Sequence, residues 1–284
     1  MLDSDTKILG VLGNPIKHSL SPVIQNHFLR TNKIDASYFT FEIGKNELSA
    51  VIKGAEAMGF LGFNVTMPFK QDIIRFLDDI DHTAEIMDSV NTIIFDQKRK
   101  KSKGYNTDGD GILLAIKDSG IDLKDKNVLV LGAGGTARSA VFSIIKNPVK
   151  KIYIYNRTQK KAEEVLKRFE KYADNKIRVL KSLELNKKSV KDIDLIINCT
   201  SLGMKGNDRK MPVPKDWDLC GKTVMEMVYN PINTDLVDKS QKDGARIIKG
   251  LDVLINQAAH SFYLWFNVLP ERKSIRKVLF DEYK

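Results

Sequence analysis

The stretch VLVLGAGGTA, residues 128 to 137, decides the fold of this chain. Four apolar residues run into a glycine-rich turn, where Gly132, Gly134 and Ala137 form the pattern G-x-G-x-x-A, and a helical pattern follows. The first glycine makes a tight turn, the second lets the backbone approach a pyrophosphate, and the small third residue packs the helix on the strand. Amide groups at a helix start also attract negative charge. Such turns also occur for structural reasons, but in this context we predict a dinucleotide-binding loop made of Gly132, Ala133, Gly134, Gly135, Thr136 and Ala137.

The end of the next predicted strand indicates which dinucleotide is bound. NAD-binding chains carry an acidic residue there, about 20 residues beyond the glycines, that holds the ribose hydroxyls. Here the place reads YNRTQKK, residues 155 to 161, and contains no carboxylate. Arg157, with Lys161, offers the charged donors that a 2′-phosphate prefers, and Asn156 and Thr158 flank the arginine. We therefore expect NADP; the structural alternative is an exposed helix start with ordinary surface cations.

Apolar runs alternate with helical patterns on both sides of this stretch. Strand-like runs before it are KILGVLG, SYFTFEI and GFNVTMP, and those after it are KKIYIYNRT, DLIINCTS, KTVMEMVYNP and ARIIKG. Such alternation is typical of a parallel or mixed sheet covered by helices, so we predict an α/β fold. The pattern restarts near residue 106, which separates a first domain, 1–106, from a Rossmann-like domain, 107–250. The helical stretch that follows comes after a completed sheet and is placed to cross back to the first domain.

The composition is that of a globular, enzyme-sized protein. The 284 residues are 42% hydrophobic and 29% charged, which allows a sizeable core. No apolar run reaches the roughly 18 residues of a membrane span, and the start, MLDSDTK, has no signal-peptide features. We expect a cytoplasmic protein without a membrane partner. The two cysteines and four histidines show no metal-binding spacing, so we expect no metal site.

The net charge of +10 is unevenly distributed. Half of the excess lies in KRKKSK, residues 98 to 103, between the strand-like segments NTIIFD and GYNTDG. A nucleic-acid site would also need interleaved aromatic side chains or a known binding fold. We therefore predict a solvated hairpin tip and no nucleic-acid partner.

Three polar clusters follow predicted strands, where open sheets bind ligands: GNPIKHSLSP at 13–22, NVTMPFK at 64–70 and NTDGDG at 106–111. Together with SVNTI at 89–93 and VYNP at 228–231, they occur in an order that resembles the shikimate dehydrogenase family over essentially the whole chain. The resemblance implies a substrate domain, an NADP domain, and C-terminal helices, 251–284, that return to the first domain. It also implies reversible NADPH-dependent reduction of 3-dehydroshikimate to shikimate, in aromatic amino-acid precursor synthesis, by a monomer or homodimer.

The resemblance further implies roles for single residues. The catalytic pair is Lys70 and Asp108. The substrate-binding groups are Ser19, Ser21 and Tyr229 at the carboxylate and Thr66, Asn91 and Gln257 at the ring hydroxyls. The cofactor site gains Asn198, Thr200 and Gly250.

Ketone reduction suits the implied pair, because the carbonyl oxygen needs a proton donor while hydride arrives at carbon. A lysine held near a carboxylate can supply that proton. Lys70 follows Pro68, on the first turn of the helical pattern FKQDIIRFL, where its side chain can be aimed into a cleft. Bland alternatives exist: a solubilising Lys70, helix caps at Ser21 and Asp108, and a buried helix amide at Gln257.

One position departs from the family pattern. Glu226, three residues before Tyr229, stands where aspartate is usual, which keeps the charge and concerns local packing. Two alternative functions also stay open. One is a broader enzyme that accepts quinate or NAD; the other is a non-catalytic nucleotide sensor on the same fold, which would not need both Lys70 and Asp108.

Overall fold

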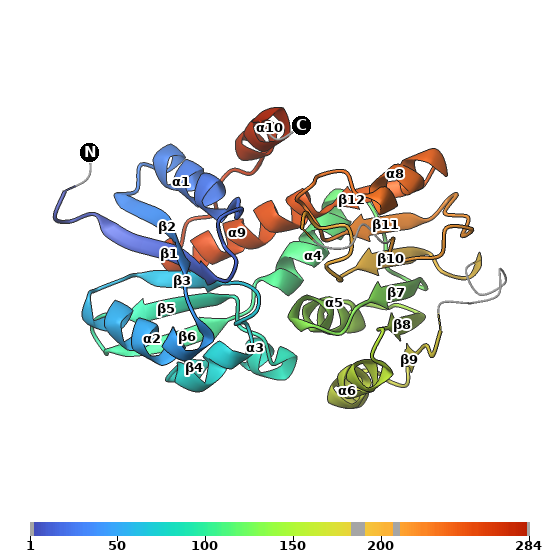
Figure 1. The fold of residues 1–284 in the computed structure, drawn as a ribbon, viewed down its shortest axis with the longest axis horizontal. Coiled ribbons are helices and arrows are strands. Elements are labelled where there is room, and N and C mark those ends of the chain that lie inside the picture. The colour runs from blue at the N-terminus through green and yellow to red at the C-terminus, as the bar shows by residue number, and fades with distance from the viewer. Residues whose placement is uncertain (1–2, 183–190, 207–210, 283–284) are drawn as a thin grey trace. The chain divides into compact units, whose positions relative to one another are not determined.

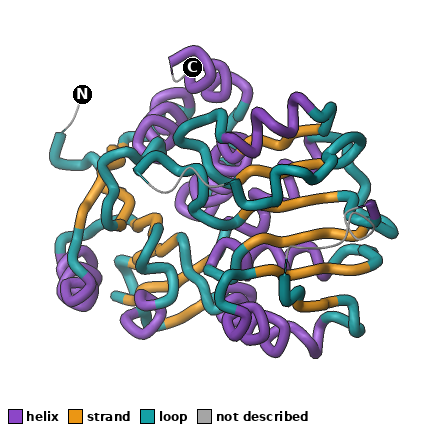
Figure 2. Tube along the Cα trace, turned by 45° about the vertical axis from the view of Figure 1, so that its right-hand side comes forward, coloured by secondary structure: helices purple, strands orange, loops and turns teal. Residues whose placement is uncertain are grey.

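The computed structural model describes residues 3–182, 191–206 and 211–282, which divide into two compact units, each built on a six-stranded sheet (Figure 1). Of these residues, 3–108 and 255–282 belong to the first unit and 109–254 to the second. Each unit combines strands with helices packed beside them (Figure 2), so the α/β fold class predicted from the alternating pattern is confirmed. The unit boundaries lie at 108 and 254, where the sequence pattern placed them at 106 and 250.

The sheet of the first unit is mixed, with strand order β2-β1-β3-β5-β6-β4. β1 (Lys7–Gly13) pairs in parallel with β2 (Ala36–Glu42) and β3 (Gly62–Val65); β5 (Thr92–Asp96) is antiparallel to β3 and to β6 (Lys101–Tyr105), and β4 (Asp79–Ile80) is parallel to β6. The helices are α1 (Ser21–Thr31), η1 (Lys45–Glu47), α2 (Leu48–Ala57), η2 (Asp72–Phe76), α3 (His82–Met87), most of α9 (Gly250–Phe266), and α10 (Lys273–Glu282). Buried Phe63 and Phe69 lie in the core cluster of this unit.

The sheet of the second unit is parallel throughout, with strand order β12-β11-β10-β7-β8-β9. Its strands are β7 (Asn127–Leu131), β8 (Lys151–Tyr155), β9 (Ile177–Val179), β10 (Leu195–Asn198), β11 (Thr223–Glu226) and β12 (Arg246–Lys249). Its helices are α4 (Asp108–Asp118), α5 (Gly135–Ile145), α6 (Gln159–Phe169), η3 (Glu170–Tyr172) and α8 (Asp235–Lys242). Since the strand order reverses between β7 and β10, the carboxyl ends of these strands form the switch point at which doubly wound sheets bind nucleotides.

Burial patterns explain these elements. All five residues of β7 are buried, as expected for a central strand of a parallel sheet covered on both faces. On α6 the buried residues are Ala162, Val165 and Phe169, spaced so that they share one face of the helix. Among the residues described, no helix is long and apolar enough to cross a membrane.

Three local expectations need correction. The helical pattern around Lys70 is a turn followed by the 3-10 helix η2, because the Lys70 carbonyl accepts from Val90 N and is not used in a helical hydrogen bond. Ser21 does not cap α1: the N-cap is Leu20, without a side-chain hydrogen bond.

The basic segment does form a hairpin, between β5 and β6, but only part of it is the tip. Lys101 and Lys103 lie in β6, and the ammonium group of Lys103 pairs with Asp79 at 2.9 Å.

Candidate active site

The first unit contains a close ion pair at the lysine that the sequence singled out. Lys70 Nζ donates to Asp108 Oδ2 at 2.5 Å, and the two side chains are only 18% and 11% exposed. The turn around Lys70 is held on both sides: buried Phe69 anchors it in the core, and the Lys70 carbonyl accepts from Val90 N at 2.8 Å. The lysine is therefore aimed at one carboxylate instead of moving freely in solvent.

Asn91 orients the other oxygen of this carboxylate. Its Oδ1 accepts from Thr107 N at 2.8 Å, and a backbone amide can only donate, so the Asn91 amide has one possible orientation. Its Nδ2 then donates to Asp108 Oδ1 at 2.8 Å. The Asp108 amide in turn donates to Asn106 Oδ1 at 3.1 Å. Both carboxylate oxygens and the backbone of Asp108 are thus held in place.

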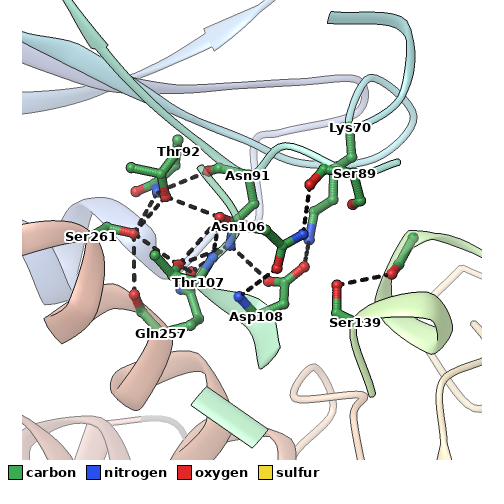
Figure 3. Close-up of polar contacts among 12 residues, drawn as sticks. Lys70, Ser89, Asn91, Thr92, Asn106, Thr107, Asp108, Ser139, Gln257 and Ser261 are labelled. Atoms are coloured by element: carbon green, nitrogen blue, oxygen red, sulfur yellow. Dashed lines mark hydrogen bonds and ion pairs between the residues drawn. The ribbon is translucent and has the colours of Figure 1, made fainter. Parts of the chain in front are cut away.

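Two residues of helix α9, Gln257 and Ser261, complete this hydrogen-bonded cluster (Figure 3). Gln257 Oε1 lies 3.3 Å from Asn91 Nδ2 and 3.4 Å from Thr107 Oγ1. One turn later, Ser261 Oγ lies 2.8 Å from Thr92 Oγ1 and 3.1 Å from Thr107 Oγ1. Four of the predicted site residues, Lys70, Asn91, Asp108 and Gln257, are therefore brought into one hydrogen-bonded cluster.

Sequence reasoning missed the buried residues that support this cluster. Asn64 Nδ2 donates to the Asn91 carbonyl and to Thr92 and Ser261 at 3.0–3.1 Å, and Asn64 Oδ1 accepts from Tyr38 at 2.7 Å. The motifs NVTMPFK and NTDGDG include Asn64 and Thr107, but no motif in the sequence includes Ser261. Its contribution depends on the return of α9 to the first unit.

Three more predicted substrate residues follow the parallel strands β1 and β3. Thr66 comes directly after β3, and Ser19 and Ser21 come at the start of α1, after β1. Ser19 Oγ accepts from Ser21 N at 3.2 Å, and Ser21 is buried beside Tyr38, whose pKa is raised well above its ordinary value, mainly by burial. Carboxyl ends of parallel strands meet at one sheet edge, so Thr66 and the two serines lie at the same edge of this sheet.

The glycine loop of the second unit has the geometry that a pyrophosphate needs. Gly132 has φ +111°, which strains any residue with a side chain, and a Cβ there would also make a tight 3.2 Å contact with the Cys199 carbonyl. Gly134 is the N-cap of α5, and a Cβ there would meet no atom within 4 Å. The amide groups at this helix start are open to an anion, so the residues present fit a dinucleotide.

The predicted ribose-phosphate residues follow β8. Arg157, Thr158 and Lys161 are exposed, and Asn156 Nδ2 donates to the Thr158 carbonyl at 2.9 Å. Two exposed cationic side chains, Arg157 and Lys161, therefore follow the carboxyl end of β8, and the Asn156–Thr158 hydrogen bond closes the turn that leads into α6.

Asn198 is the last residue of β10 and Thr200 follows this strand, and their side chains are hydrogen-bonded to each other. Asn198 Oδ1 accepts from Thr200 N at 3.1 Å and from Thr200 Oγ1 at 2.7 Å, and Asn198 Nδ2 donates to Glu226 Oε1 at 2.8 Å. Because Asn198 is fully buried, it acts on the edge of the sheet by orienting Thr200. Asn198 stays a predicted cofactor-site residue, next to Thr200.

Tyr229 and Gly250 also belong to the second unit, after β11 and β12. Burial raises the pKa of Tyr229, which keeps its phenol neutral and able to donate. At Gly250 a Cβ would lie 2.6 Å from the Met227 carbonyl, so the close approach of the two strand ends requires glycine. Within the described chain, no group of three or more metal-ligating side chains is found.

Three family models match consecutive parts of the chain. They are described as the shikimate dehydrogenase substrate binding domain, at residues 11–93, shikimate / quinate 5-dehydrogenase, at residues 114–205, and the shikimate 5′-dehydrogenase C-terminal domain, at residues 250–280. Shikimate dehydrogenase (NADP(+)) of Methanococcus aeolicus is 36% identical over 282 residues, which is 99% of each chain.

Solved structures agree with these matches over the whole length. A shikimate dehydrogenase in complex with NADP+ has a TM-score of 0.91 and 34% identity, covering 100% of this chain and 98% of that one. Shikimate 5-dehydrogenase from Listeria monocytogenes, in complex with shikimate and NAD, has a TM-score of 0.89 and 30% identity, covering 98% of each chain. The sequence motifs, the two units and the full-length similarity lead to one conclusion: the chain belongs to the shikimate dehydrogenase family.

Proposed function

We propose that this protein is an NADP-dependent shikimate dehydrogenase that interconverts 3-dehydroshikimate and shikimate. The observation that carries the proposal is the Lys70–Asp108 pair, a proton donor and its carboxylate partner held in a largely buried polar cluster. We expect the enzyme to act in the cytoplasm as a monomer or homodimer, in the synthesis of aromatic amino-acid precursors.

The proton step belongs to Lys70. When bound, NADPH supplies the hydride to the ketone carbon. The Lys70 ammonium group donates a proton to the carbonyl oxygen. The ketone thus becomes an alcohol, with the hydride added at carbon and this proton added at oxygen. Asp108, held by Asn91, keeps the ammonium group oriented, so that it can stabilise the negative charge that develops on oxygen. In the reverse direction Lys70 accepts the proton of the substrate hydroxyl.

Binding is assigned to the remaining residues. Ser19, Ser21 and Tyr229 would hold the substrate carboxylate, and Thr66, Asn91 and Gln257 its ring hydroxyls. The glycine loop would hold the cofactor pyrophosphate, with Thr200 and Gly250 at the same sheet edge. Arg157 and Lys161 would pair with the 2′-phosphate, since an arginine fork matches phosphate geometry.

The test is a set of four assays that follow the NADPH or NADH absorbance band with purified protein. Shikimate or quinate is combined with NADP or NAD, and we expect the fastest reduction of the cofactor in the assay with shikimate and NADP. A larger rate with quinate would favour the broader dehydrogenase, and the Listeria complex with NAD makes the NAD arm informative. Folded protein that gives a flat trace in all four assays would favour the nucleotide sensor.

A further inference from the structure

The second unit buries one carboxylate that the reaction described above does not use. Glu226, the last residue of β11, is fully buried, and its two oxygens accept hydrogen bonds from several donors. Oε1 accepts from Asn198 Nδ2 at 2.8 Å and from Val228 N at 3.0 Å, and Oε2 accepts from Thr234 Oγ1 at 2.9 Å. One side chain therefore bonds to the end of β10, the loop after β11 and the start of α8.

These loops carry residues assigned to cofactor and substrate. The Asn198 amide that bonds Glu226 is the group that orients Thr200, and Val228 directly precedes Tyr229. The backbones of the two loops are also joined, since Met227 N donates to the Asn198 carbonyl at 3.1 Å. Gly250 packs against the Glu226 carbonyl, where an added Cβ would approach to 2.8 Å.

We propose that Glu226 is a positioning residue, whose ionised carboxylate ties the Thr200 loop to the Tyr229 loop and holds both in the arrangement that binds cofactor and substrate. The inference rests on the proposed function, because it assigns Glu226 a task at the same nucleotide-binding edge. Glu226 itself touches neither ligand in this assignment.

The geometry also decides where a proton would go. Oε1 faces an amide group fixed by Thr200 N and a backbone amide, and both of these groups can only donate. Oε2 faces a hydroxyl, which can accept as well as donate. Protonation therefore takes place at Oε2, and it leaves Oε1 as a neutral acceptor whose bonds to both loops are weaker than those of a carboxylate.

Burial raises the pKa of Glu226 from 4.5 to about 7, against the effect of its hydrogen bonds from Val228, Thr234, Asn198 and the Met227 backbone. The titratable or charged side chains on the segments that pack around it are Cys199, Tyr229, Asp235, Asp238, Lys239, Lys242, Arg246, Lys249 and Asp252. Of these, Lys249 is its register partner on β12, and Lys249 Nζ donates to Asn233 Oδ1 at 3.2 Å. No charged residue is among the causes of the Glu226 shift, so its charge changes near neutral pH through desolvation.

The test compares the wild type with Glu226→Gln, which keeps the shape and the acceptor at the Oε1 position but cannot ionise. NADP affinity is measured by isothermal titration at about pH 8 and about pH 6, with circular dichroism to verify folding. We expect the wild type to bind NADP about threefold to tenfold more tightly than Glu226→Gln at the higher pH, and within about twofold at the lower pH. The 2′-phosphate of NADP also titrates in this pH range, but its effect on affinity is the same for both proteins and so does not contribute to the difference between them.

Two further measurements separate positioning from mere packing. The KM for shikimate should follow the same pH-dependent difference, because Tyr229 is held by the same carboxylate. Asp238→Asn removes an exposed carboxylate from α8 and should behave as the wild type does at both pH values. A Glu226→Gln protein with wild-type affinity at both pH values, or with an equal loss at both, would overturn the proposal. NADP titration needs no turnover, so it decides this point even if shikimate proves not to be the substrate.

Discussion

Replacing Glu226 by glutamine should change how stability depends on pH, and the structure sets the sign. The pKa of Glu226 is raised from 4.5 to about 7 in the folded chain, so the folded protein binds this proton more tightly than the unfolded chain. The contribution of the group to the free energy of unfolding is fully present below the unfolded pKa. It is lost as the pH rises through about 7.

The magnitude follows from the two pKa values. They differ by about 2.5, and each pKa unit corresponds to about 1.36 kcal/mol, which makes about 3.4 kcal/mol in full. Between about pH 8 and about pH 5 the linkage relation yields about 2.5 kcal/mol of this, because the unfolded carboxyl is still mostly ionised at the lower value. We therefore expect the free energy of unfolding of the wild type, relative to that of Glu226→Gln, to rise by about 2.5 kcal/mol as the pH is lowered from about 8 to about 5.

The chain offers a probe for the unit concerned. It has two tryptophans, and Trp217 is buried in the second unit whereas Trp265 is in the first. In a Trp265→Phe background, urea unfolding followed by fluorescence reports on the surroundings of Trp217. Wild type, Glu226→Gln and Asp238→Asn are compared at each pH, so that the contributions of all other titrating groups to the free energy of unfolding cancel in the difference. A wild-type-minus-Gln difference that stays flat with pH, or that falls as the pH is lowered, would refute the reasoning.

Further substitutions test the proposed roles of Lys70, Asp108, Arg157 and Gly250. Lys70→Ala and Asp108→Ala should each lower kcat about 10²- to 10⁴-fold with a smaller change in KM, and the double variant should be little worse than the poorer single one. Lys45→Ala, which breaks the exposed Lys45–Asp72 pair of the same unit, is the matched control and should keep its activity; a multiplicative double variant would argue against a joint mechanism. Arg157→Ala should raise the KM for NADP and leave that for NAD nearly unchanged, whereas equal losses would make the arginine structural. Gly250→Ala forces a Cβ against the Met227 carbonyl and should destabilise the protein by about 1–3 kcal/mol, measured as a lower thermal midpoint; an unchanged midpoint would show that the strand ends can separate.

The sequence by itself determined the fold class and the cofactor loop, because both depend on local patterns. An apolar strand, a glycine turn and a small residue in the next helix are read within ten residues, and Gly132 indeed has a left-handed backbone. The motifs NVTMPFK and NTDGDG likewise placed Lys70 and Asp108 in loops after strands. Their pairing, across 38 residues, came from the resemblance and not from any local rule.

Only the tertiary structure decided how these groups are held. Ser261 supports Thr92 and Thr107 because α9 returns to the first unit, and no periodicity in the sequence predicts that contact. The turn at Lys70 was expected to be an α-helix, but buried Phe69 and the bond to Val90 stop a regular helix from forming. In the sequence, Glu226 is a conservative exchange for the usual aspartate, yet its pKa depends on burial and on hydrogen bonds that include one from Asn198, 28 residues away. Burial and hydrogen bonding are properties of the folded chain, so the chemistry of such a group is set only when the strand ends meet.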